Sequence, residues 1–243
     1  MPRAEPSRPC RPRHRTLTGF SKEADLVATF LPGVCPASAG QVRAFREWPV
    51  GHRIADVAVM HFDSAPSLTE TGRQLLRLEY PYLRVLAELL IRPLREQSLA
   101  MRLIMSVAQV ARSLAALLRR GLVSRSPNGA FAVEGWASSL PGRVILYEAK
   151  LTDWRCAVEQ AVFYRSFATE SFVAMPSAMQ PRRELRAQCK RQGVGLLFVE
   201  PTGALIVSVR PTADRPRSSA THNAVRLHLY QRVLRGLANA ATV

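Results

Sequence analysis

The sequence has 243 residues, a formal net charge of +16 at pH 7 and an apolar content of 47%. These values indicate a globular protein with its own core and exclude a membrane span, because no apolar run approaches the ~18 residues that a span needs. The basic excess is typical of proteins that bind polyanions, most often nucleic acid, although arginine enrichment without any charged partner would also produce it.

The N-terminal segment, residues 1–16, is rich in arginine and proline and contains no apolar stretch of the kind found in secretory signals. We expect it to be a disordered basic tail. The cysteines are widely spaced and form no C-x-x-C pair, so they predict neither a zinc site nor a disulfide framework. Free thiols are typical of a reducing cytoplasm, where we expect this protein to reside.

Residues 17–76 are predicted to form the first part of an α/β core. A helix is expected to begin after Ser21 as its N-cap and to end before Pro32, and two strands are expected around a turn at Gly51. The second strand carries Asp56 as its one acidic side chain among apolar neighbours. A lone carboxylate in an apolar strand is a local inconsistency, and such inconsistencies are frequent at functional sites.

Residues 77–137 change character and are predicted to form an insert. Three helical segments are expected, followed by a hairpin that turns at Asn128-Gly129. This order is the order of a winged helix-turn-helix. The predicted helices cover residues 80–91, 93–103 and 107–120.

Residues 138–243 return to alternating strands and helices, which predicts the second part of the α/β core. A helix is expected from Asp153 as N-cap to about Ala168, directly after the strand "RVILYEAK". The further predicted elements are a strand at 171–176, a basic helix at 181–192, paired strands at 193–201 and 204–211, and a closing helix at 222–240.

The strand "RVILYEAK" places Glu148 and Lys150 on one face, because side chains alternate along a strand. If the strand that carries Asp56 lies beside it, two carboxylates and a lysine meet at one strand end. Gln160 and Tyr164, one helical turn apart, can approach from the next helix. Paired carboxylates bind Mg²⁺ or Mn²⁺ through their oxygens. A bound metal ion with a lysine beside it can catalyse the hydrolysis of a phosphodiester.

This pattern, D…E-x-K followed by Q-x-x-x-Y, resembles the PD-(D/E)xK nuclease superfamily, and its glutamine and tyrosine are most similar to the RecB-like branch. The resemblance implies a restriction-endonuclease-like mixed sheet flanked by helices and a metal-dependent nuclease that acts on DNA. It implies Asp56 and Glu148 as metal ligands, Lys150 as the catalytic lysine, and Gln160 and Tyr164 as supporting helix residues.

The same family often has a further acidic residue on its first helix, for which Glu23 is the candidate metal ligand and Glu47 an alternative. The family's proline is replaced here by Ala55. A short E-x-K pattern is a weak signal without its context. The alternative interpretation is an ion pair at a sheet edge, formed by Glu148 with Lys150 or with a nearby arginine.

The insert resembles winged helices of the MarR- and ArsR-like kind, which implies duplex DNA as the partner. On its third helix Gln109, Arg112, Ser113 and Ala116 are predicted to face outward, where the first two could reach base edges. Arg125, on the wing, would contact phosphate. Ile104 stands where the turn between the two helices usually has glycine. The alternative is an insert that contacts protein or forms a homodimer.

Two other functions remain open at this point. The chain could be a non-catalytic DNA-binding regulator that uses a nuclease-like scaffold, or it could be a protein-interaction module. All the motif-type residues are present, which favours the enzyme, because an inactive site usually loses its lysine or a carboxylate. The sequence leaves open the choice between DNA and RNA, the cleavage specificity and the oligomeric state.

Overall fold

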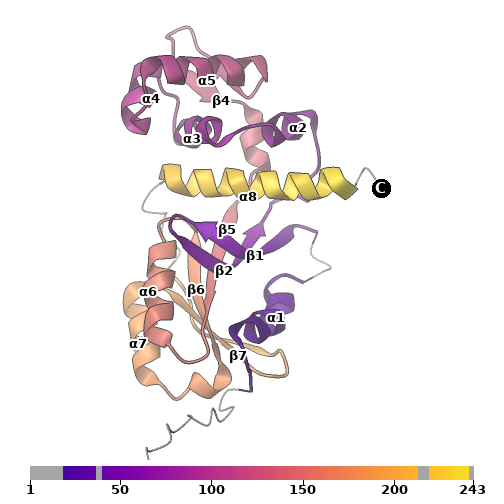
Figure 1. Cartoon of the computed structure of the whole chain (residues 1–243), viewed down its shortest axis with the longest axis vertical. Coiled ribbons are helices and arrows are strands. Elements are labelled where there is room, and N and C mark those ends of the chain that lie inside the picture. The colour runs from indigo at the N-terminus through magenta and orange to yellow at the C-terminus, as the bar shows by residue number, and fades with distance from the viewer. Residues whose placement is uncertain (1–18, 37–39, 213–218, 241–243) are drawn as a thin grey trace, which may run out of the picture.

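The computed structural model describes residues 19–36, 40–212 and 219–240, and the expected tail at 1–16 lies outside this part of the chain (Figure 1). The helices and strands form a sheet with its flanking helices and a separate group of helices with a short hairpin. In chain order they are α1 (Glu23–Val34), β1 (Val42–Val50), β2 (Arg53–His61), α2 (Glu70–Leu76), α3 (Tyr80–Leu89), α4 (Glu96–Leu103), α5 (Val107–Arg119), β3 (Val123–Arg125), β4 (Phe131–Val133), β5 (Arg143–Ala149), α6 (Trp154–Tyr164), β6 (Glu170–Pro176), α7 (Arg183–Gln192), β7 (Gly195–Val199), β8 (Leu205–Val209) and α8 (Ser219–Ala240).

Six strands form one mixed sheet in the order β1-β2-β5-β6-β7-β8. The β1–β2 hairpin is antiparallel, β2 pairs antiparallel with β5, and β5, β6 and β7 run parallel before β8 reverses direction. The two remaining strands of the described chain, β3 and β4, form a hairpin of their own. The α/β class predicted from the sequence is confirmed as a mixed sheet flanked by helices.

Helices cover both faces of the six-stranded sheet. The apolar side of α1, with Leu26, Val27 and Phe30, packs on one face against Val57 and Tyr147. On the opposite face, α6 and α7 cover the β6–β7 side, and α8 covers the hairpin and β5. This arrangement follows from alternation along the strands, because successive side chains enter different apolar clusters.

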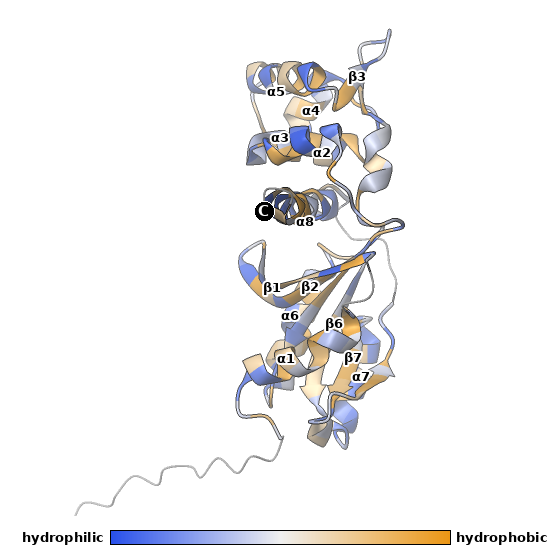
Figure 2. Ribbon diagram, turned by 90° about the vertical axis from the view of Figure 1, so that its right-hand side faces the viewer, coloured by the Kyte–Doolittle hydropathy of each residue, from blue (hydrophilic) through white to orange (hydrophobic). Residues whose placement is uncertain are grey.

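Helix α8 lies between the sheet and the helices of the insert (Figure 1), and Figure 2 views it end-on in that position. Its buried amides are satisfied by backbone carbonyls on the insert side. Asn223 donates to Ala87 at 3.1 Å, and Gln231 donates to Leu75 at 2.7 Å and to Leu78 at 3.1 Å. Because one continuous apolar cluster also spans α5, α8 and β5, the insert and the sheet share a single core.

The first helix differs from its prediction at both ends. It begins at Glu23, after Lys22 rather than Ser21 as the N-cap. The carboxylate of Asp25 accepts hydrogen bonds from the Lys22 N–H at 3.1 Å and from the Ser21 hydroxyl at 2.6 Å, so an internal acid performs the capping role. Pro32 lies inside the helix, in its last turn, where it removes one backbone hydrogen bond just before the helix ends at Val34.

Two further boundaries differ from the sequence prediction. The short helix α2 was not predicted; it begins after Thr69, whose hydroxyl accepts a hydrogen bond from the Gly72 N–H at 3.1 Å. Helix α6 ends at Tyr164, whereas it was expected to continue to about Ala168. Asp153 is its N-cap, as predicted, and accepts from the Cys156 N–H at 3.2 Å.

Within the described residues, no single helix combines the length and the apolar character that crossing a membrane requires, although α4 and α5 together meet the criterion as a pair bent by 116°. The bend is made by Ile104, which ends α4 in the left-handed region with φ 52° and ψ 49°. This is the glycine-type conformation that the turn was expected to need, adopted by a β-branched residue at a cost in backbone energy.

Candidate functional site

The site is built where strands β2 and β5 separate. Their antiparallel pairing ends at Val57 and Tyr147, so Asp56 and Glu148 are the next residues along each strand. Beyond that point the backbone N–H of Ala149 donates to Oδ2 of Asp56 at 2.6 Å. A side chain therefore replaces the missing ladder bond, and it fixes the Asp56 carboxylate beside the end of β5.

Glu148 and Lys150 extend from the end of β5 toward each other and toward helix α1. The Lys150 Nζ lies 3.0 Å from Glu148 Oε1 and 3.1 Å from Glu23 Oε2. The Glu148 residue is only 2% exposed, and the Lys150 side chain is 19% exposed. The Lys150 N–H also donates to the Ala174 carbonyl of β6 at 3.2 Å, which holds the lysine backbone against the neighbouring strand.

Helix α6 delivers the two residues predicted to support the site. The Tyr164 hydroxyl lies 2.9 Å from Glu148 Oε2, 2.8 Å from the Ile54 carbonyl oxygen and 3.5 Å from Gln160 Oε1. A phenol has one hydrogen to donate, so it cannot serve three acceptors at once. With Glu148 neutral, the carboxyl hydrogen can be donated to the phenol oxygen while Tyr164 donates to Ile54.

The electrostatic environment is consistent with that proton arrangement. Burial, and then the charge of Asp56, raise the pKa of Glu148 to about 7. Burial also raises the pKa of Asp56. Burial would lower the pKa of Lys150, but the charge and hydrogen bond of Glu148 outweigh it and leave the pKa raised. The lysine is therefore a permanent cation beside two carboxylates that water solvates poorly.

The oxygen donors of the site suit a divalent metal only in part. Within the described residues, no group of three or more His, Cys, Asp and Glu side chains is arranged as a metal centre. Asp56 and Glu148 are nevertheless two hard oxygen donors, and the charge of Asp56 helps to raise the pKa of Glu148. Mg²⁺ is commonly held by one or two carboxylates with water and phosphate. The residues present therefore fit a metal of this kind.

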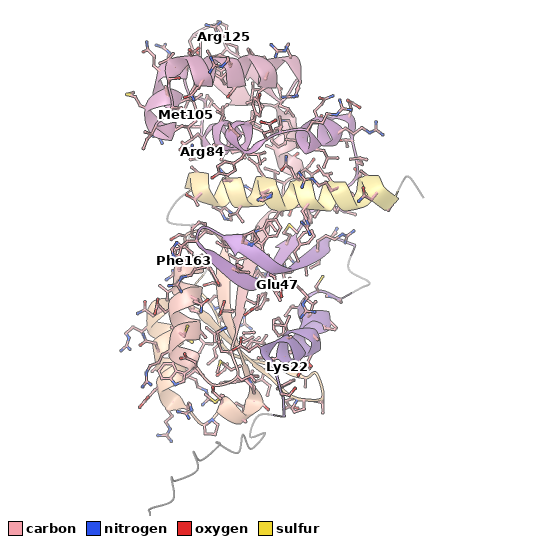
Figure 3. All side chains as sticks on the ribbon, viewed as in Figure 1. Lys22, Glu47, Arg84, Met105, Arg125 and Phe163 are labelled. Carbon is pink, nitrogen blue, oxygen red and sulfur yellow. The ribbon has the colours of Figure 1, made fainter. Side chains whose placement is uncertain are left out.

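Glu47, which the sequence offered as the alternative to Glu23, lies on β1 rather than on the first helix. Arg46 pairs with Val57 and Trp48 pairs with Ala55, which places Glu47 in register with Asp56, and the ladder has no pair there. Glu47 adopts a φ of 51°, in the left-handed region. Figure 3 labels it on the β1–β2 hairpin. Its charge adds to the rise in the pKa of Asp56, and no sequence signal short of the fold reveals this strain.

The structure thus brings together all six residues predicted for the metal site and its surroundings: Asp56, Glu148, Lys150, Gln160, Tyr164 and Glu23. They come from four parts of the chain: the start of α1, strand β2, the end of β5 and helix α6. Such a cluster can bind a cation between the Asp56 and Glu148 carboxylates and place the Lys150 ammonium beside it, while the Tyr164 hydroxyl hydrogen-bonds to Glu148. What it lacks in the described chain is a third carboxylate in direct contact with the first two.

The predicted nucleic-acid residues of the insert are only partly exposed. Arg112 and Arg125 are exposed, and the Arg125 guanidinium lies 5.6 Å from the Phe131 ring centroid. Gln109 is exposed, but its side-chain oxygen accepts from the Ser106 N–H at 3.0 Å in a capping box. Arg112 and Arg125 therefore remain available for phosphate or base contacts, whereas Gln109 is already engaged.

The outward orientation expected for Ser113 and Ala116 is wrong. Ser113 is 5% exposed and donates to the Gln109 carbonyl, and Ala116 is 8% exposed. Helix α5 buries its face at Val110, Ser113, Leu114, Ala116 and Leu117, while Val107 and Leu118 are exposed. The small side chains let neighbouring helices approach, and apolar spacing alone cannot detect that preference.

Comparison of the chain with protein-family models, with curated proteins and with solved structures finds no match.

Proposed function

We propose that the protein is a metal-dependent nuclease that hydrolyses phosphodiester bonds of DNA. The observation that carries the proposal is the contact of Lys150 with Glu148, at 3.0 Å, beside a second carboxylate, Asp56, where β2 and β5 separate. An ammonium and two poorly solvated carboxylates at one strand end are the chemistry that phosphodiester hydrolysis needs.

The strand order supports a restriction-endonuclease-like core of the PD-(D/E)xK kind. An antiparallel hairpin, β1–β2, is joined to β5, and α6 connects β5 to the parallel strand β6. Asp56 lies on the hairpin, Glu148 and Lys150 lie on and just after β5, and Gln160 and Tyr164 lie on the crossover helix. This is the distribution that the resemblance to the RecB-like branch implies.

In this proposal Asp56 and Glu148 would hold Mg²⁺ or Mn²⁺, and Glu23 would join them only if Lys150 releases it. When bound, the ion stabilises negative charge on the phosphoryl group and makes a bound water more acidic. Lys150 orients the attacking water and offsets the charge that develops on the phosphate oxygens. Tyr164 holds Glu148 in place, and Gln160 supports the tyrosine.

The insert is proposed to be a winged helix that binds duplex DNA. Three helices, α3 to α5, precede the β3–β4 hairpin, and the left-handed Ile104 makes a sharp turn between α4 and α5. Arg112 would reach the groove and Arg125 the phosphate backbone. Because α8 packs against both the insert and the sheet, bound duplex would lie at a fixed orientation to the cleavage site.

A second function is favoured by one observation. Lys150 is already neutralised by Glu148 and Glu23, which is the behaviour of a structural ion pair. In that case the protein is a non-catalytic DNA-binding regulator on a nuclease-like scaffold. Supercoiled plasmid incubated with Mg²⁺, Mn²⁺ or EDTA separates the two proposals. Nicking with either metal and none with EDTA supports the nuclease, while binding without nicking under any of these conditions supports the regulator.

A further inference from the structure

A cavity of about 370 Å³ lies between α6 and α7, outside the proposed metal site. The two helices pack side by side in the structure (Figure 1), with a shared apolar cluster beneath them. The volume falls in the range of roughly 300–1,000 Å³ that is typical of pockets for small organic groups. From α6 it is lined by Trp154, Arg155, Val158 and Val162, and from α7 by Gln188 and Gln192.

This cavity is called the α6–α7 groove, or the groove. On its α6 side, Arg155 and Trp154 form a flat surface that carries a positive charge. The Arg155 guanidinium carbon lies 4.6 Å from the Trp154 ring centroid, so the arginine is supported by the indole beneath it. The Arg155 side chain is 76% exposed. Guanidinium planes and aromatic rings are the surfaces on which proteins stack unpaired bases. Val158 and Val162 continue the apolar surface next to it.

The α7 side offers hydrogen-bonding groups at the spacing of one helical turn. Gln188 and Gln192 each carry an amide, which can donate and accept, as the edges of nucleobases also do. The Gln188 side-chain oxygen accepts from Arg191, which brings a second guanidinium to the rim. An apolar surface on one side and amides on the other match a planar heterocycle better than an aliphatic group.

The charge around the groove favours a polyanion. Helix α7 carries Arg183, Arg186, Lys190 and Arg191 against one acidic residue, Glu184, which lies 3.8 Å from Arg155. The carboxylate of Glu159, also at the rim, is paired with Arg53 at 2.8 Å. The acidic side chains at the groove therefore each have an arginine partner. On α7, Arg186 donates to Ser208 and Arg191 to Gln188. Arg183 and Lys190 are exposed and remain for phosphate.

The groove is close to the proposed cleavage site along the chain. Trp154 follows Lys150 by four residues, so their Cα atoms lie at most about 14 Å apart. Even at the ~3.4 Å axial rise of a strand stacked as in duplex DNA, this distance covers no more than about four nucleotide steps. We propose that the groove binds one unpaired nucleobase of the substrate strand, within about four nucleotides of the scissile phosphate.

This inference rests on the proposed nuclease function and specifies which form of DNA the nuclease would act on. A base inside a duplex is stacked on both faces and cannot enter a pocket without being extruded, so the groove selects an unpaired base. With duplex held by the insert and an unpaired base held by the groove, the substrate class is DNA in which duplex adjoins a single-stranded overhang or flap.

The test is binding without cleavage. Fluorescence anisotropy in EDTA compares a labelled hairpin duplex carrying a six-nucleotide overhang with the same hairpin carrying an abasic overhang of equal charge. We expect about 10-fold tighter binding of the overhang with bases, since stacking of one base is worth ~1–3 kcal/mol. Arg155→Ala should abolish the difference, and Gln188→Ala should reduce it. Both side chains lie on the surface of their helices, so folding should persist.

Arg182→Ala is the matched control, because Arg182 is exposed beside α7 but does not line the groove. It should weaken both complexes equally. Equal affinity of the wild-type protein for the two overhangs, or a full preference retained in Arg155→Ala, would overturn the groove proposal. Neither result touches cleavage, which tests the nuclease separately. Absent cleavage together with an intact preference for bases would overturn the nuclease and support the groove.

Discussion

Asp56 accepts a hydrogen bond from the backbone N–H of Ala149 at 2.6 Å, just beyond the last ladder pair of β2 and β5. The bond joins the strand that carries one carboxylate to the backbone between Glu148 and Lys150. One interaction thus fixes the relative position of all three charged groups, although they belong to segments about ninety residues apart. The geometry of the site consequently depends on Asp56 as an acceptor, and its chemistry depends on Asp56 as an anion.

Asp56→Asn separates these two roles, because asparagine keeps an oxygen that can accept from Ala149 and removes the charge. We expect a folded protein with a melting temperature within a few degrees of wild type. Calorimetric titration with Mn²⁺ should give a measurable enthalpy for the wild type and none for the variant. Asp63→Asn, at an acidic residue outside the site, should titrate as the wild type does. Equal binding by Asp56→Asn would contradict the metal assignment.

The raised pKa of Glu148 predicts an unusual pH dependence in the metal-free protein. The folded-state pKa is about 7 and the unfolded value 4.5, so the folded state binds more protons between these limits. The contribution of this group to the free energy of unfolding is therefore greatest below about pH 4.5 and is lost as the pH rises through 7. Asp56, with its raised pKa, acts in the same direction, and the charges of Lys150 and Glu23 face both groups.

Glu148→Gln isolates this contribution. The histidines whose pKa is lowered by burial, His61, His222 and His228, act in the opposite direction but equally in both proteins. Melting curves in EDTA from pH 5 to pH 8 should show the variant gaining stability relative to wild type as the pH rises. A difference between the two proteins that stays constant over this range would show that Glu148 titrates normally.

The insert makes its own prediction for duplex DNA. Arg112→Ala should weaken duplex binding by ~1–3 kcal/mol if it reaches a base edge, and anisotropy at fixed salt measures this. Ser113→Ala is the matched control, because the structure buries Ser113 and leaves it no access to DNA. A loss of affinity in Ser113→Ala equal to that of Arg112→Ala would contradict the observed orientation of α5.

Ile104 provides a test of stored backbone energy. It is 93% exposed and holds φ at 52°, a conformation that costs L-residues roughly 1–2 kcal/mol and glycine almost nothing. Ile104→Gly should therefore raise the urea midpoint of unfolding. Met101→Gly, at an exposed position inside α4, should lower that midpoint, because glycine in a helix interior reduces the free energy of unfolding by ~1 kcal/mol. Destabilisation by both changes would argue against the left-handed turn.

The grouping of the candidate site residues was predictable because it depends on the short repeat periods of strands and helices. Strand alternation places Glu148 and Lys150 on one side, and one helical turn separates Gln160 from Tyr164. The pairing of β2 with β5 required only that the two apolar strands be neighbours. Strand alternation and helical spacing depend only on residues that are near in sequence, so they can be recognised before the fold is known.

Other features depend on tertiary contacts that no local pattern encodes. Glu47 adopts a left-handed φ where the β1–β2 ladder has no pair, opposite Asp56. The burial of Ser113 depends on the helices that pack on α5. The role of α8 as a layer between sheet and insert rests on Asn223 and Gln231, whose carbonyl partners lie more than a hundred residues earlier. Pairings over such separations are decided by the whole fold.

The most direct test of the account is the cleavage rate of Lys150→Met against that of wild type, on supercoiled plasmid in Mn²⁺ under single-turnover conditions. Methionine preserves the apolar stem and removes the ammonium that contacts Glu148 and Glu23. We predict metal-dependent nicking by the wild type and a rate lower by ~10²–10³ in the variant, with Mn²⁺ and DNA binding retained. Cleavage by Lys150→Met at the wild-type rate, or no cleavage by the wild type with any divalent metal, would contradict the nuclease proposal.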